Sequence, residues 1–131
     1  METIPLLALI VNIAKAIADK IGGESESKDA LETLLAINNA AKETLKYEAW
    51  RGTQNGQRDP GKEQEISANW YGVSYRVYGY SQELAGRLKF KGDYWQSPDS
   101  WTELEITDAG IDLERVVDET DRLLKPRLKK R

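Results

Sequence analysis

Apolar residues recur every three or four positions along several stretches of the chain, and this spacing limits the fold more than any other feature of the sequence. The clearest stretch covers residues 28–51, in which Leu31, Leu34, Leu45 and Ala49 fall on one side of a helix. Three other stretches repeat the same spacing. The sequence therefore predicts an all-α fold, a single-domain helical bundle.

This bundle is expected to contain about four main helices. Pro5 suits the first turn of a helix, and Gly22 follows the first apolar stretch as a helix end. Pro126 is expected to end the last helix. The expected helices cover residues 5–21, 28–51, 63–79 and 112–124, with short helical turns between Ser81 and Ile106. The bundle domain would then span residues 1–124, and a basic tail would follow over residues 125–131.

Residues 62–81 carry two competing patterns. Tyr71, Val73, Tyr75 and Val77 alternate as in a half-buried strand, but Gly79 stands where the next large side chain is needed. Spacings of four and three favour a helix instead, through Ile66, Trp70, Val73, Val77, Tyr80 and Leu84. We therefore predict a helix here, with a strand as the alternative.

The 131 residues include no histidine and no cysteine. This composition excludes Ser-His-Asp and Cys-His catalysis, zinc sites of the His/Cys kind and thiol redox chemistry. The remaining polar residues show no spacing that indicates a reaction. We therefore expect no enzymatic activity, no catalytic residues, no cofactor and no metal site.

Two patterns resemble functional motifs by chance. Residues 56–62 fit the G-x-x-x-x-G-K spacing of a phosphate-binding loop, but Glu63 replaces the hydroxyl that coordinates magnesium, and a helix is expected before the loop where the motif needs a strand. The pairs Asp108 with Asp112 and Asp118 with Asp121 have the spacing of helical metal ligands. We interpret these carboxylates as parts of solvated helix faces and helix starts.

Charge is distributed unevenly along the chain. The net charge is −3, and five of the 19 basic residues lie in the last seven positions, so the rest of the chain has 14 basic and 22 acidic residues, a net charge of −8. An acidic body repels phosphate, so any nucleic-acid contact would fall to the tail. These tail residues are Lys125, Arg127, Lys129, Lys130 and Arg131.

Nine of the 11 aromatic residues fall between Trp70 and Trp101. These two tryptophans are in phase with aliphatic neighbours and are expected to be buried, whereas Trp50 lies beside the glycine-rich loop 52–61. Three tyrosines would form a second stripe on the helix that carries Trp70. The first helix also looks more apolar than a surface helix requires.

One four-helix core should not absorb all of this apolar surface, and surplus apolar surface indicates an interface. We therefore expect self-association, as a symmetric dimer, or a complex with another protein, and we interpret the chain as a protein-interaction or assembly module. The alternative is a nucleic-acid accessory protein in which the tyrosines stack on bases. The expected interface residues are Leu7, Val11, Tyr71, Tyr75 and Tyr78.

The apolar stretch within residues 1–22 is the one candidate for a membrane or targeting segment. It is too short to span a bilayer, and Glu2 stands where a secretory signal has basic residues. We expect no membrane span and a cytoplasmic location.

Three segments carry a resemblance to a known group of proteins. They read AKETLKYEAWRG, LKFKGDYWQSPDSW and AGIDLERVVDETDRLL. Over Ala30–Leu124 the chain resembles a set of small bacterial proteins that are all-helical and have no assigned activity. The resemblance implies a helical fold and favours the helix over residues 62–81.

Overall fold

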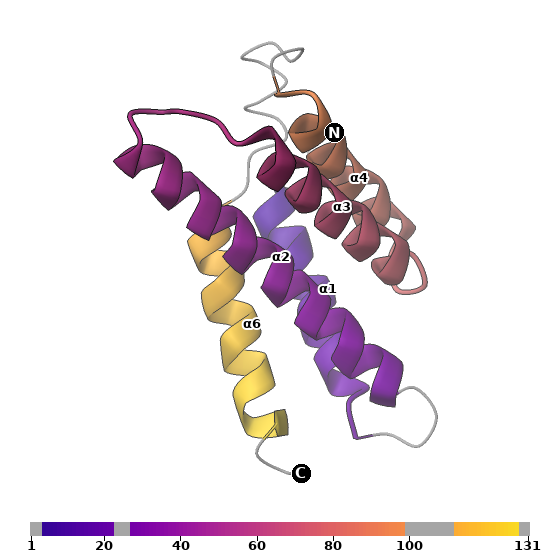
Figure 1. Cartoon of the computed structure of the whole chain (residues 1–131). Coiled ribbons are helices and arrows are strands. Elements are labelled where there is room, and N and C mark those ends of the chain that lie inside the picture. Colours follow the sequence, from indigo (N-terminus) through magenta and orange to yellow (C-terminus); the bar gives the residue numbers. More distant parts are fainter. Residues whose placement is uncertain (1–3, 23–26, 99–111, 129–131) are drawn as a thin grey trace.

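The structure is a computed structural model, and it describes residues 4–22, 27–98 and 112–128 (Figure 1). These residues form five helices and no strand, so the predicted all-α class is confirmed. The helices are α1 (Leu6–Asp19), α2 (Ser27–Thr53), α3 (Pro60–Val77), α4 (Gln82–Gln96) and α6 (Leu113–Leu128).

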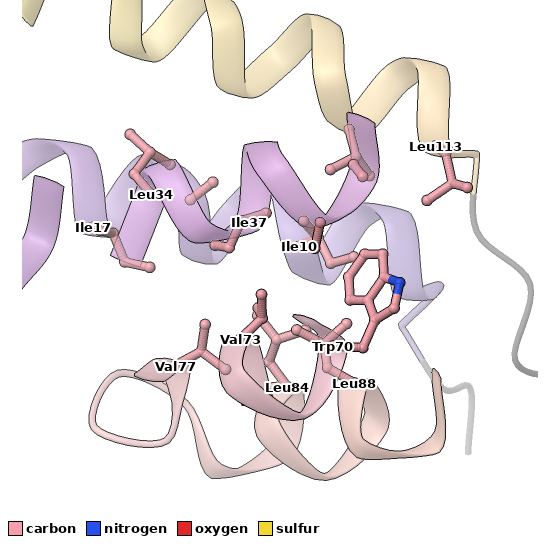
Figure 2. Packing of buried hydrophobic residues seen from close by; sticks show 14 of the residues in the cluster. Ile10, Ile17, Leu34, Ile37, Trp70, Val73, Val77, Leu84, Leu88 and Leu113 are labelled. Atoms are coloured by element: carbon pink, nitrogen blue, oxygen red, sulfur yellow. The ribbon is translucent and has the colours of Figure 1, made fainter. Parts of the chain in front are cut away.

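The long helix α2 organises the bundle. Figure 1 shows α2 passing between α6 on one side and the hairpin of α3 and α4 on the other, with α1 behind it. Helix α1 contacts α2, α4 and α6, which explains why its apolar stripe is wider than a surface helix needs. One continuous apolar core fills the space between these helices (Figure 2).

The expectation of about four main helices was wrong by one, because residues 82–96 form a full helix and not short turns. The Ser81 hydroxyl caps α4 by accepting a hydrogen bond from the Leu84 amide at 3.1 Å. Leu84, Leu88 and Trp95 bury the inner face of the helix. This extra helix absorbs part of the apolar surface that a four-helix core would have left exposed.

Residues 60–77 are helical, as the spacing of four and three predicted. Asp59 caps α3, since its Oδ1 atom accepts a hydrogen bond from the Lys62 amide at 3.1 Å, and Pro60 follows in the first turn. Trp70 is fully buried, as predicted. Its indole Nε1 donates to the Thr44 hydroxyl at 3.0 Å, which fixes α3 against α2.

The last helix does not end before Pro126, and this expectation was wrong. Helix α6 runs through Pro126 to Leu128. The Arg127 guanidinium donates to the carbonyl of Leu123 at 2.7 Å and to the carbonyl of Ala18 in α1 at 3.0 Å. These two bonds hold the last turn and offset the hydrogen bond that proline cannot make.

Helices α3 and α4 approach closely at Gly92, where the missing side chain leaves room for the ring of Tyr71. A Cβ atom on Gly92 would lie 2.7 Å from that ring, whereas a Cβ on Gly86 in the same helix would meet nothing within 4 Å. The Ser67 hydroxyl also donates to the Gly92 carbonyl at 2.7 Å. The contact therefore depends on glycine at position 92.

We expect Gly92→Ala to lower the free energy of unfolding by about 1–3 kcal/mol, because the added methyl group overpacks the contact with Tyr71. Gly86→Ala should raise it by about 0.5–1 kcal/mol, the usual gain from replacing an exposed helical glycine. Urea denaturation of both variants measures the difference. Equal stabilisation by both substitutions would contradict the close approach.

Candidate interaction groove

A hollow of about 610 Å³ lies where the end of α3 and the turn after it meet α1 and the start of α2. We call it the tyrosine groove. Tyr75 is 86% exposed and Tyr78 is 59% exposed, so most of both side chains is open to a partner. The groove is lined by Ile13, Ala16, Lys20, Asp29, Tyr75, Arg76, Tyr78, Gly79 and Tyr80.

The end of α3 positions the two exposed tyrosines. Val77 is fully buried, and its carbonyl accepts hydrogen bonds from the amides of Tyr80 and Ser81, both at 2.8 Å. With Val77 held in the core, its neighbours at positions 75 and 78 lie on the outer side of the helix end. The buried valine therefore presents both tyrosines to solvent.

Tyr80 forms the inner wall of the groove. Its hydroxyl donates to the Asp29 carboxylate at 2.7 Å, which connects the turn after α3 to the start of α2. The Lys20 ammonium lies 6.0 Å from the centre of the Tyr80 ring. Both interactions hold the Tyr80 ring in place, so this wall of the groove has its shape before a partner binds.

The rim of the groove carries both signs of charge. Lys20 and Arg76 contribute cations, and Asp29 contributes a carboxylate. The Arg76 guanidinium also lies 3.7 Å from the Glu32 carboxylate on α2. Aromatic rings with mixed charged groups at the edge are the usual composition of a protein-binding surface.

The structure brings together two of the five expected interface residues, Tyr75 and Tyr78. Tyr71 lies apart from them, because its hydroxyl donates to the Asp93 carboxylate and contacts the Gln96 amide oxygen at 2.9 Å. The hydrogen bond to Asp93, helped by burial, raises the pKa of Tyr71 to about 12. Tyr71 thus joins α3 to α4.

Leu7 and Val11 on α1 are half-buried, and neither lines the groove. Helix α1 contributes Ile13 and Ala16 instead, and Lys20, the residue that follows the helix, also lines the groove. These three positions are three and four residues apart, so they share one side of α1. Their spacing was visible in the sequence, but only the packing shows that this side faces the tyrosines.

The described residues of the basic tail, Lys125 and Arg127, do not line the groove. Lys125 and Arg127 belong to α6, while Lys129, Lys130 and Arg131 lie outside the described residues. Arg127 donates to the backbone carbonyl of Ala18 in α1.

A second group of polar side chains lies at the far end of α2. The Tyr47 hydroxyl donates to the buried Glu63 carboxylate and accepts from the Asp59 amide at 3.0 Å. The Arg58 guanidinium donates to Glu63 at 2.6 and 3.1 Å. This network anchors the loop between α2 and α3 to the bundle.

Burial alone would raise the pKa of Glu63, but the hydrogen bonds from Arg58 and Tyr47 outweigh burial and lower it. The carboxylate is therefore ionised and paired at neutral pH, and its oxygens are occupied. We assign it a structural role. The polar groups hold the loop in place, beside a smaller hollow of about 260 Å³ that Tyr47, Asp59 and Lys62 help to line.

The phosphate-loop spacing and the acidic pairs noted in the sequence also have structural explanations. Helix α2, and not a strand, precedes the segment that resembles a phosphate-binding loop, and Lys62 lies 3.6 Å from Glu65. Asp112 caps α6 by accepting from the Arg115 amide at 3.2 Å. In the part of the chain that the structure describes, no three acidic residues gather as metal ligands would.

Trp101 and Asp108 lie outside the described residues, so their expected places in the core and at a helix start stay predictions. Across the described ranges, the helices are too short or too polar for any of them to cross a membrane. Comparison of the chain with models of protein families, with curated proteins and with solved structures gives no match.

Proposed function

We propose that this chain is a non-catalytic protein-interaction or assembly module of a bacterial multi-protein system, and that it binds its partner through the tyrosine groove. The partner is a second copy of the chain, in a symmetric dimer, or a segment of another protein. For the bacterial setting we rely on the resemblance of residues 30–124 to small bacterial proteins.

One observation carries this proposal. Tyr75 and Tyr78 are largely exposed, and both line a hollow of about 610 Å³. Tyr80 forms a wall of this hollow, and its hydrogen bond to Asp29 holds the ring in place. Tyrosine offers a large contact area, one polar group and little entropy to lose, and it is enriched among the residues that dominate binding energy. Two exposed tyrosines beside a hollow therefore favour a binding surface.

The absence of histidine and cysteine from the sequence also supports a binding role. At the far end of α2, Tyr47, Arg58 and Glu63 are hydrogen-bonded to one another and hold a loop. A binding function needs only shape, aromatic surface and charge at the rim, all of which the groove provides.

Sedimentation velocity over a range of concentrations tests the self-association branch. We expect the double variant Tyr75→Glu/Tyr78→Glu to weaken the dimer at least about 30-fold, the effect of losing a contact worth roughly 2 kcal/mol. Phe90→Glu is the matched control, since Phe90 is 58% exposed on α4 and lies outside the groove. It should leave the dimer intact.

One result would decide between the two kinds of partner, and two others would count against the proposal. If the chain stays monomeric at high micromolar concentration, the dimer is excluded and the partner must be another protein. In that case Tyr75→Glu should abolish capture of this protein. If that substitution changes neither assembly nor capture, the groove is an ordinary surface. Binding to single-stranded nucleic acid that weakens steeply with salt would favour the accessory-protein alternative.

A further inference from the structure

The loop after α2 contains the one asparagine that precedes a glycine. The chain has five asparagines, and four of them, Asn12, Asn38, Asn39 and Asn69, lie within helices and precede other residues. Asn55 lies in the exposed turn after Thr53 and is followed by Gly56. Glycine puts no side chain in the way of its own amide nitrogen, so this nitrogen can reach the asparagine side chain.

The backbone at this turn has an unusual conformation. Asn55 has a φ of 55° and Gly56 a φ of 81°, and in the described residues Asn55 is the only non-glycine residue with positive φ. The Gly56 amide donates to the Arg51 carbonyl at 2.8 Å, a bond typical of a helix end with left-handed residues. The Arg51 guanidinium donates to the Gly56 carbonyl at 3.0 Å. Arg51 therefore holds Gly56 at two points, at its amide through the Arg51 backbone carbonyl and at its carbonyl through the Arg51 side chain.

We infer that Asn55 is a site of spontaneous deamidation, and that Arg51 controls its rate by holding Gly56, at the amide through its backbone carbonyl and at the carbonyl through its side chain. In this reaction the Gly56 nitrogen, losing its proton, attacks Cγ of Asn55. A bond between this nitrogen and Cγ forms, the bond from Cγ to Nδ2 breaks, and ammonia leaves. Water then opens the cyclic imide to aspartate or isoaspartate, so one amide and one water become one acid and one ammonia.

The hydrogen bond to Arg51 opposes the first step. An amide whose hydrogen is held by a carbonyl must leave that bond before its nitrogen can attack, so the reaction passes through local opening of the last turn of α2. The free energy of this opening decides how fast the folded chain is modified. Loss of the Arg51 side chain removes one of the two holding bonds and should make opening easier.

The product would change both charge and shape at the turn. Each event adds a negative charge next to Arg51, and an isoaspartate also adds a backbone atom within a turn that depends on left-handed residues. The modification would therefore loosen the end of α2 that the Tyr47 and Glu63 network holds. It would leave the tyrosine groove, at the opposite end of α2, intact.

Peptide mapping by mass spectrometry after incubation at mildly alkaline pH tests the inference in the full chain. We expect a mass increase of about one unit confined to the peptide with Asn55, slowest in the folded protein and fastest in urea. Arg51→Ala should accelerate it about two- to tenfold, the factor expected from loss of one hydrogen bond. Asn55→Gln should abolish it.

Hydrogen exchange of the Gly56 amide is a second readout that does not depend on the chemistry. It should become faster in Arg51→Ala by a similar factor, while far-ultraviolet circular dichroism stays the same. Equal deamidation rates in the folded protein, in Arg51→Ala and in urea would overturn the control by Arg51. A dominant modification at another asparagine, or none in urea, would overturn Asn55 as the site.

Discussion

Replacement of Trp70 by alanine is expected to lower the free energy of unfolding by about 3–5 kcal/mol, the usual cost of removing a buried aromatic ring. Trp70, on α3, is fully buried in the core, and its indole nitrogen donates to the Thr44 hydroxyl of α2. The substitution leaves a cavity in the centre of the core (Figure 2) and removes this hydrogen bond. Urea denaturation followed by circular dichroism measures the loss.

Trp50→Ala provides the comparison. Trp50 is 39% exposed and stacks on Tyr47, with ring centres 5.8 Å apart, so its removal should cost only about 1 kcal/mol. Trp70→Phe separates the two contributions at position 70, since it keeps most of the ring and loses the bond to Thr44. Similar losses for Trp70→Ala and Trp50→Ala would contradict the packing.

The second large effect concerns the ion pair between Arg58 and Glu63. Arg58→Ala should lower the free energy of unfolding by about 2–4 kcal/mol, because it leaves the Glu63 carboxylate buried without its cation. The Arg58 side chain is 31% exposed, which places the effect somewhat below that of a fully buried pair. Lys62→Ala is the control, since its partner Glu65 is well exposed, and it should cost less than about 1 kcal/mol.

The same pair makes stability depend on pH. The pKa of Glu63 is lower in the folded chain than its ordinary value of 4.5, so the unfolded chain takes up the proton first as pH falls. The stabilisation by Glu63 is therefore complete well above pH 4.5 and is lost as pH falls through the folded pKa. Arg58→Ala should flatten this acid limb of the stability curve, and an unchanged limb would contradict the assignment.

The sequence predicted the fold class because most core positions follow the helical period. For residues 82–96 it predicted only short helical turns and not the full helix α4, and the reason lies in two residues. Lys91 and Gly92 are both buried between Leu88 and Trp95, where the pattern requires large apolar side chains. Burial lowers the pKa of Lys91, and attraction to Glu48 partly offsets this effect. Because a lysine and a glycine occupy two inner positions of α4, the apolar spacing typical of a helix is interrupted in the sequence.

The candidate site was predictable only in part. Tyr75 and Tyr78 were identified from their spacing, but Tyr71 shares that spacing and still lies against α4. The difference arises because α4 approaches α3 at Gly92, next to Tyr71. No local sequence pattern indicates this close approach of the two helices. Tyr71 and Gly92 are 21 positions apart in the chain and meet only after the hairpin of α3 and α4 forms.

The buried acid at position 63 was also beyond sequence reasoning. A charged residue in a helix is normally solvated, and Glu63 is buried only because Tyr47 and Arg58 surround its carboxylate. Arg58 lies five residues before it, in the loop, and Tyr47 lies on another helix. The pairing depends on how the loop returns to the bundle, which the apolar period does not describe.

The central claim is that a partner protein contacts the groove at Tyr75, and site-specific photocrosslinking in the native host tests it most directly. A photoreactive phenylalanine analogue at position 75 should give one defined adduct, whose mass identifies a second copy or another protein. The same analogue at position 90, an exposed aromatic position outside the groove, should give none. No adduct at position 75, or the same adducts from both positions, would contradict the claim.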